Sequence, residues 1–325
     1  MKIVANEFIM PIRENWSAHA SHLIPLDNGE VFCVFFYGTA ESNDDVRIYG
    51  SLRSSEGVWS EPVALSEDDG VPHWNPVLFR RNDGSVILFY KVGKTIANWQ
   101  TRIMLSHDNC RTWNNSYEMI PGDTTGGRGP VRNKPIYLSD GTILAPGSTE
   151  QGEWKCFFDR STDDGKTWVR TDDIRLPAEM LEKYDTLISR GIIQPTVWET
   201  EAGIHALMRS SEGFVFRTDS TDGINWTQPQ AINLPNNNSG IDAVRLPDGR
   251  IILACNPVSD NWGKRTPLSL FVSRDNGFHF ELLTHLVTCS RGGYAYPALQ
   301  YDCGKLHISY TWDRETICYM CFEDI

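Results

Sequence analysis

Short apolar runs recur along the chain in pairs, and a turn that contains glycine separates the two members of each pair. Six such pairs are recognisable, with their turn glycines at Gly29, Gly84, Gly141, Gly203, Gly249 and Gly304. Most of these turns read Asp-Gly or Asn-Gly, or place Asp close by, which is typical of a β-hairpin because glycine adopts the positive φ that a tight turn needs. Six hairpins at a similar spacing predict a repeat architecture.

A second repeat runs out of phase with the hairpins and has the form Ser-x-Asp-x-Gly-x-Thr-Trp. Its cleanest copy spans 161–168, with further copies at 106–113 and 273–280, a shorter one at 220–226 and a degenerate one at 53–59. The Ser and Asp oxygens of such a turn can accept hydrogen bonds from its own amides, while the aromatic residue packs below. We therefore expect these turns to stabilise the fold rather than to bind a ligand.

The two repeats together predict an all-β chain in which residues 1–325 form one domain. The expected architecture is a six-bladed β-propeller with four-stranded antiparallel blades. Residues 3–9 read as a strand, which we expect to pair with the last strand of the chain, because closing the ring removes exposed sheet edges. The only helix-like segment lies between 179 and 190.

Charge and composition narrow the classes of partner. The formal net charge is −12 and the pI is about 5.1, which disfavours nucleic acid as a partner. No apolar run is long enough to cross a membrane, and the N-terminus lacks the apolar core of a signal peptide. The eight cysteines are scattered, so we expect free thiols and a cytoplasmic protein. The composition is compatible with a monomer and with a homo-oligomer.

Polar residues stand at equivalent points of the repeat, at the ends of the apolar runs. The inner strands of a propeller converge on one axis, so we expect these ends to surround a single pocket. Those before the first runs include His19, His22, His73, Trp74, Asn75, Arg132, Lys134, Gln194, Asp242 and Tyr296, and those after the second runs include Lys91, Arg209 and Trp312. Any one of them can equally be a structural polar group.

The Ser-x-Asp-x-Gly-x-Thr-Trp turns are known as Asp-boxes, and with them the whole chain resembles the sialidase superfamily of β-propellers. That resemblance implies three arginines that bind a carboxylate, an Asp as acid/base, and a Tyr nucleophile that a Glu activates. Arg209 and Arg265 match the second and third arginines. Tyr296, in Ala-Tyr-Pro-Ala-Leu, matches the nucleophile, and Asp44 and Asp45 stand where the acid/base is expected.

Two positions depart from the sialidase pattern. The segment His19-Ala20-Ser21 stands where the first arginine is expected in Arg-Ile-Pro, and Gln194 stands where the activating glutamate is expected. The first change removes charge-assisted hydrogen bonds to a carboxylate. The second removes the base that helps to ionise a phenol of pKa about 10.

These residues favour an exo-acting glycoside hydrolase that removes a terminal acidic sugar from an oligosaccharide or glycoconjugate. An Asp would protonate the leaving oxygen, and Tyr296, or a water held by a His or Asp242, would approach the other face. Arg209 and Arg265 would hold the anionic group. The remaining expected site residues are His19 and Gln194 in catalysis and His22, His73, Trp74, Asn75, Lys91, Arg132, Lys134 and Trp312 in substrate binding.

Two other functions remain open. The first is a lyase acting on uronic-acid glycans, in which arginine neutralises the carboxylate and a His/Tyr pair moves the protons; His19, His22, His73 and Tyr296 would suit it. The second is a non-catalytic carbohydrate-binding propeller, which needs no carboxyl group in its pocket. No spacing of histidines and acids indicates a metal site, so we expect neither metal nor cofactor.

Overall fold

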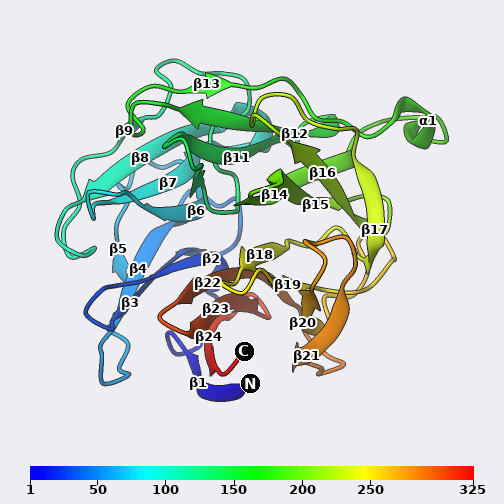
Figure 1. Ribbon diagram of the computed structural model, residues 1–325. Coiled ribbons are helices and arrows are strands. Elements are labelled where there is room, and N and C mark those ends of the chain that lie inside the picture. Colours follow the sequence, from blue (N-terminus) through cyan, green and yellow to red (C-terminus); the bar gives the residue numbers. More distant parts are fainter.

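The computed structural model describes residues 1–325, and these residues form an almost purely β structure. It has 24 strands, one four-residue helix α1 (Ala178–Leu181) and one 3-10 turn η1 (Ile96–Asn98). The sheets surround a common centre, and strands β2, β6, β14, β18 and β22 lie innermost (Figure 1). None of the helical segments has the length and hydropathy needed to cross a membrane.

Four sheets contain four antiparallel strands each. The first has β2 (Ser17–Pro25), β3 (Val31–Gly38), β4 (Arg47–Arg53) and β5 (Val63–Ala64). The second has β6 (His73–Arg80), β7 (Val86–Val92), β8 (Gln100–Ser106) and β9 (Tyr117–Glu118). The third has β18 (Asp242–Arg245), β19 (Ile251–Cys255), β20 (Leu268–Ser273) and β21 (Glu281–Val287). The fourth has β22 (Tyr294–Asp302), β23 (Lys305–Trp312), β24 (Thr316–Glu323) and β1 (Lys2–Phe8).

The fifth sheet has eight strands, where the sequence predicts two separate sheets. Its first half has β10 (Ile136–Tyr137), β11 (Ile143–Thr149), β12 (Glu153–Ser161) and β13 (Val169–Arg170). Its second half has β14 (Arg190–Thr200), β15 (Gly203–Ser210), β16 (Phe214–Ser220) and β17 (Gln230–Pro235). A short parallel pairing of Trp154 with Gly191 joins the halves. Gly191 permits this approach, since a Cβ there would lie 2.2 Å from the Trp154 carbonyl oxygen.

The predicted hairpins and the predicted end pairing are present. All six turn glycines have positive φ, between +81° and +132°. The N-terminal strand β1 pairs antiparallel with β24, the last strand of the chain. The two chain ends therefore complete one sheet, and β24 does not present an open edge.

The Asp-box turns have the structural role that their sequence predicts. In the turn at 161–168, Asp163 accepts hydrogen bonds from the Thr167 hydroxyl (2.6 Å) and the Thr167 amide (2.9 Å), and Ser161 Oγ accepts from the Gly165 amide. The Thr167 donors hold the pKa of Asp163 well below its usual range. The Asp163 carboxylate thus accepts its hydrogen bonds from within its own turn, which stabilises the turn.

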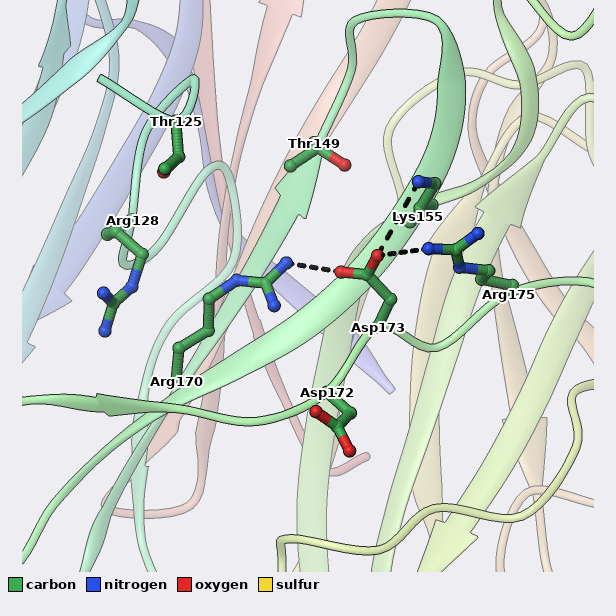
Figure 2. A pocket seen from close by; sticks show the side chains of 8 residues that line it. All are labelled: Thr125, Arg128, Thr149, Lys155, Arg170, Asp172, Asp173 and Arg175. Carbon is green, nitrogen blue, oxygen red and sulfur yellow. Dashed lines mark hydrogen bonds and ion pairs between the residues drawn. The ribbon is translucent and has the colours of Figure 1, made fainter. Parts of the chain in front are cut away.

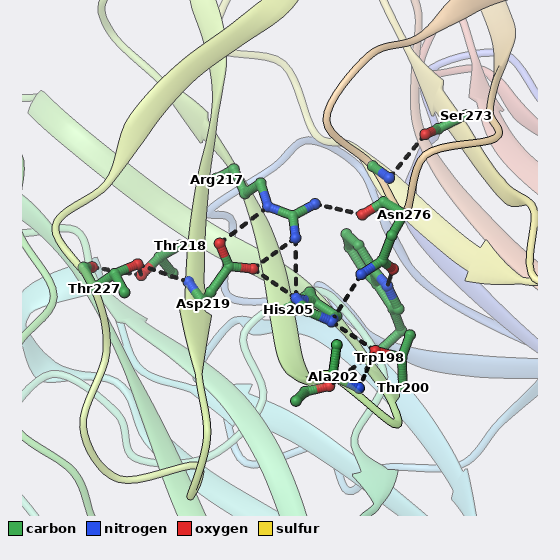
Figure 3. A network of polar contacts seen from close by, with 12 residues as sticks. Trp198, Thr200, Ala202, His205, Arg217, Thr218, Asp219, Thr227, Ser273 and Asn276 are labelled. Atoms are coloured by element: carbon green, nitrogen blue, oxygen red, sulfur yellow. Dashed lines mark hydrogen bonds and ion pairs between the residues drawn. The ribbon is translucent and has the colours of Figure 1, made fainter.

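One of these turns also ties neighbouring sheets together (Figure 3). Asn276, in the turn after β20, accepts a hydrogen bond from Trp198 Nε1 at 2.9 Å and lies 2.9 Å from His205 Nε2. Arg217 of β16 donates to the Asn276 carbonyl and to Asp219, which in turn contacts His205 Nδ1 at 2.6 Å. Polar side chains here fasten a turn of one sheet to the strands of the next.

Buried apolar side chains fill the space between each sheet, or half-sheet, and the next. Each of the following pairs belongs to one such hydrophobic cluster: Val34 and Leu88, Phe89 and Ile143, Phe158 and Met208, Leu207 and Leu253, Leu270 and Ile308, Phe35 and Tyr319. The last pair joins the C-terminal sheet to the first one. Apolar burial is the main favourable term in folding, so these clusters hold the sheets around the centre.

All eight cysteines are free thiols, as the sequence predicts. Six of them are buried, and only Cys289 and Cys303 are exposed. The pair Cys318 and Cys321 contributes to apolar packing on β24, where burial raises the pKa of both thiols.

Candidate functional site

A β-bulge interrupts four of the inner strands at a similar point. The pairing register shifts in β2, β6, β14 and β22, and a residue with positive φ lies at each shift: Ala20, Asn75, Gln194 and Tyr296. A bulge re-aims side chains, and a non-glycine residue in this conformation costs roughly 1–3 kcal/mol. Asn75, Gln194 and Tyr296 are three of the residues expected in the site, so the inner strands bend where site residues are expected.

Three arginines converge on the ring of Tyr296. The guanidinium carbons of Arg132, Arg265 and Arg209 lie 5.4, 5.5 and 5.6 Å from the centre of that ring. Arg209 Nη1 donates to the Tyr296 hydroxyl oxygen at 3.0 Å. Arg132 donates to the carbonyl oxygens of Tyr296 and Pro297, so it also holds the strained backbone of β22.

None of these three arginines forms an ion pair with a carboxylate of the chain. Arg209 donates to Gln194 Oε1 at 2.9 Å and to Asn238 Oδ1 at 3.3 Å, and both acceptors are neutral. Burial lowers the pKa of Arg132 to about 10, and it also lowers the pKa of Arg265. Desolvating a cation without a counter-ion costs several kcal/mol. The arrangement therefore favours binding of an anion.

His19 lies against Tyr296, with 4.3 Å between the ring centres. Its Nδ1 is 2.8 Å from Thr311 Oγ1, while its Nε2 is buried and has no partner. Burial lowers the pKa of His19 well below its ordinary value, and the charges of Arg314, Arg265, Arg132 and Arg209 lower it further. His19 is therefore a neutral imidazole at pH 7, and it supports the tyrosine ring without adding charge.

Glu150 is a site residue that the sequence reasoning missed. Its Oε1 accepts a hydrogen bond from Gln194 Nε2 at 2.7 Å and a longer one from Ser148 at 3.4 Å. Burial raises its pKa, although the charge of Arg209 acts in the opposite direction. A weak signal was present, since Glu150 directly follows β11, the second strand of its hairpin, and Arg209 lies near the end of the corresponding strand β15.

Asp242 lies in a different environment from Tyr296. It is fully buried and accepts hydrogen bonds from Lys134 Nζ at both oxygens (2.9 Å each), Thr196 Oγ1 (2.9 Å) and the amides of Ala243 (2.9 Å) and Leu299 (2.7 Å). These partners belong to β14, β18, β22 and the segment before β10. Asp242 and Lys134 thus link the inner strands.

Asp44 and Asp45 lie in the loop between β3 and β4. Asp45 accepts hydrogen bonds from the amide (3.0 Å) and hydroxyl (2.9 Å) of Thr39, which closes the loop on itself. Asp44 is exposed and pairs with Lys94, in the loop after β7, at 3.2 Å. No contact joins either carboxylate to Tyr296 or its arginines.

The buried basic residues expected in the site hold neighbouring segments together. His22 Nδ1 accepts from the Leu78 amide at 3.3 Å, and burial keeps its pKa well below the ordinary value. His73 contacts Ser66 at 2.6 Å and Asp69 at 3.2 Å.

Four further residues expected in the site contact groups other than Tyr296 and its arginines: Lys91, Trp74, Asn75 and Trp312. Lys91 donates to Thr101 at 2.7 Å and to the carbonyl of Arg128 at 2.6 Å, and burial lowers its pKa to about 7. Trp74 donates to the Gly93 carbonyl, Asn75 is buried at the bulge of β6, and Trp312 packs edge-on against Tyr294. The structure therefore brings together a smaller group than the sequence predicts: His19, Arg132, Gln194, Arg209, Arg265 and Tyr296.

A polar cavity of about 670 Å³ lies beside β12 and β13 (Figure 2). No hydrophobic side chain lines it, and its cations already have an acidic partner. Lys155, Arg170 and Arg175 all pair with Asp173, at 3.6, 2.5 and 2.8 Å. Asp173 thus balances the positive charges in this cavity, whereas no carboxylate balances those of the arginines around Tyr296.

The side chains do not form a group suited to a metal ion. No three His, Cys, Asp or Glu residues lie close enough together to coordinate one.

Comparisons with known proteins agree on the family and the fold. The sequence profile described as a BNR repeat-like domain matches residues 29–308. No curated protein matches the chain. The NanB sialidase from Streptococcus pneumoniae has a similar structure, with a TM-score of 0.74 and 13% identity over 97% of this chain and 71% of that one.

Two further solved structures are similar over nearly their whole length. A protein of unknown function from Dyadobacter fermentans has a TM-score of 0.75 and 16% identity, over 98% of both chains. The intramolecular trans-sialidase from Ruminococcus gnavus has a TM-score of 0.71 and 12% identity, over 94% of both chains. At such low identity the likeness shows the fold, and an activity has to be argued from the site itself.

Proposed function

Because the chain belongs to the BNR repeat-like domain family, we propose that it is an exo-acting glycoside hydrolase of the sialidase superfamily. It removes a terminal acidic sugar from an oligosaccharide or glycoconjugate. Its sheets form a six-bladed β-propeller, a count supported by the hydrophobic clusters between neighbouring sheets and by the pairing of β1 with β24. Sialidases among the similar structures support the reaction class.

The observation that carries this proposal is the set of arginines without counter-ions around Tyr296. Arg209 and Arg265 bind the sugar carboxylate, and Arg132 adds positive charge from within the protein. A charge-assisted hydrogen bond contributes about 1.5–3 kcal/mol, so two arginines can select an acidic sugar over a neutral one of the same shape.

Tyr296 faces the reacting carbon of the bound sugar. Its oxygen accepts a hydrogen bond from Arg209, so the hydroxyl hydrogen points away from this guanidinium, and the proton passes to a water molecule when the oxygen bonds to the sugar carbon. Negative charge that develops on this oxygen is stabilised by the same guanidinium. Gln194 accepts from Arg209 through Oε1 and donates to Glu150 through Nε2, which fixes the position of both partners.

Glu150 is the carboxyl group that best suits protonation of the leaving oxygen. Its raised pKa favours the protonated form, and it is linked to Tyr296 through Gln194 and Arg209. Asp44 and Asp45 are the alternative, on the loop where the sialidase pattern places its acid. Glu150→Gln should lower kcat by about 100-fold or more. If the Asp44→Asn/Asp45→Asn variant is inactive and Glu150→Gln is active, the general acid is Asp44 or Asp45 and not Glu150.

The reaction is tested with a panel of sialyl, uronyl and neutral oligosaccharides, analysed by mass spectrometry. We expect cleavage of an acidic glycan with the uptake of one water per bond. An unsaturated product would instead indicate a lyase. Binding of the glycan without any product would indicate a carbohydrate-binding propeller, and either result would overturn the hydrolase.

Arg265→Ala tests the carboxylate assignment directly. We expect kcat/KM on acidic glycans to fall roughly 10- to 150-fold, which corresponds to one lost charge-assisted hydrogen bond. The melting temperature should not fall, because the change removes a largely buried cation that has no carboxylate partner. Arg274→Ala is the matched control, since Arg274 is exposed and pairs with Glu281 on β21. Unchanged activity in Arg265→Ala would show that the arginine assignment is wrong.

A further inference from the structure

A fourth arginine lies where the first sheet contacts the C-terminal sheet. Arg314 is in the turn between β23 and β24, and its carbonyl accepts a hydrogen bond from the Ala18 amide at 2.9 Å. Ala18 directly precedes His19, whose ring lies against Tyr296. The backbone of Arg314 is therefore fixed to the strand that begins beside the candidate site.

The same turn is tied to the segment that leads into Tyr296. The Asp313 amide donates to the Gly293 carbonyl, and the Gly293 amide donates to Asp313 Oδ1, both at 2.9 Å. The next residue, Tyr294, donates its amide to the Arg265 carbonyl at 2.9 Å. Arg265 and Arg314 thus flank one segment, two to three residues before Tyr296.

Arg314 differs from the other three arginines because it has an acidic partner. Its Nη1 lies 2.5 Å from Glu41 Oε2, and the two side chains are 39% and 36% exposed. Glu41 lies in the loop between β3 and β4, so this ion pair bridges the first sheet and the C-terminal sheet. Both charges act on Arg265, whose pKa Arg314 lowers and Glu41 raises.

We propose that Arg314 is a further binding residue for the substrate's carboxylate, and that Glu41 is its resident counter-ion, which an acidic ligand displaces. The inference rests on the proposed function, because it assumes a carboxylate at Arg209 and Arg265. Glu41 offers Arg314 the same chemical group as the substrate would, so the two carboxylates compete for one guanidinium. Because the Arg314–Glu41 pair is partly exposed, its ion pair is weak, and the substrate carboxylate can displace Glu41 at little cost.

The proposal predicts opposite effects for the two members of one ion pair. Glu41→Gln removes the competitor and should tighten binding of an acidic sugar about two- to fivefold, the range expected for a partly exposed pair. Arg314→Gln removes a binding group and should weaken binding about tenfold. The double variant should bind like Arg314→Gln alone, because Glu41 acts only through Arg314.

Calorimetry with N-acetylneuraminic acid and glucuronic acid measures these constants, and the methyl ester of each sugar provides an uncharged counterpart. Glu281→Gln is the matched control, since Glu281 pairs with Arg274 on the exposed strand β21 and should leave binding unchanged. Melting temperatures of all variants verify that they are folded.

The outcomes separate this inference from the proposed function. If Arg265→Ala abolishes binding while Glu41→Gln weakens it or leaves it unchanged, the competition is refuted and the carboxylate site stands. If neither acid binds better than its methyl ester, the carboxylate site itself is overturned, and the role of Arg314 falls with it. Equal tightening for the acid and for its ester would also refute the competition.

Discussion

Replacing Asp242 by Asn should destabilise the whole ring of sheets. The buried carboxylate accepts hydrogen bonds from Lys134, Thr196 and the amides of Ala243 and Leu299. An asparagine keeps the shape but has one acceptor oxygen instead of two, and it carries no charge to balance the ammonium group of Lys134. That ammonium is nearly buried, with 12% of the side chain exposed.

Removing one partner of a buried ion pair costs about 3–5 kcal/mol. Unfolding entropy is about 2.1 cal/mol/K per residue, so a chain of 325 residues has about 0.7 kcal/mol/K in total. The loss therefore corresponds to a fall in melting temperature of about 4–7 °C. Because Asp242 links three inner strands and the segment before β10, we expect the transition to stay cooperative and move as a whole.

Scanning calorimetry and urea unfolding of Asp242→Asn measure this loss. The informative control is Asp242→Asn combined with Lys134→Met, which removes both charges. The double variant should recover a large part of the loss, since no uncompensated ammonium remains. A single variant within about 0.5 kcal/mol of the native protein would refute the reasoning, because that is the range of an ordinary surface substitution.

Two further predictions concern catalysis and pH. Tyr296→Phe removes the hydroxyl that accepts from Arg209, so kcat should fall about 100-fold or more while a carboxylate inhibitor still binds; full activity would exclude Tyr296 from the chemistry. Burial lowers the pKa of His307 to about 4. Between pH 6.5 and 4 the folded state therefore binds fewer protons than the unfolded state. The free energy of unfolding then has its full His307 contribution above pH 6.5 and loses about 3 kcal/mol of it as the pH falls to 4. Urea unfolding at pH 7 and pH 4.5 should show a smaller loss for His307→Gln, and equal losses in both proteins would contradict the assignment.

Local chemistry along the chain was sufficient to predict the elements of the fold. Gly84 and Gly249 adopt positive φ in tight turns because the flanking apolar runs and the Asp-Gly pair leave few alternatives. Asp163 accepts its own turn amides, an interaction that spans only a few residues. The strand β1 pairs with β24 as predicted, because an unpaired edge strand would expose a row of backbone donors and acceptors.

The fusion of two sheets into one depended on the tertiary structure. The parallel bridge between Trp154 and Gly191 joins segments that are 37 residues apart, and it rests on the space left by the missing Cβ. No periodic pattern of apolar residues encodes such a contact, because only two residue pairs take part in it.

The sequence by itself determined which residue types stand at the inner ends of the strands, among them Arg209 and Tyr296, and the resemblance to the sialidase superfamily added Arg265. Only the tertiary structure decided which of the polar residues meet. Asp242 accepts hydrogen bonds from neighbouring strands, whereas the arginines around Tyr296 lack a carboxylate partner. The structure also adds Glu150 and Arg314 to the site, and no sequence motif marks either residue. The physical reason is that a charge takes its role from its partners, and those partners come from other sheets, far away along the chain.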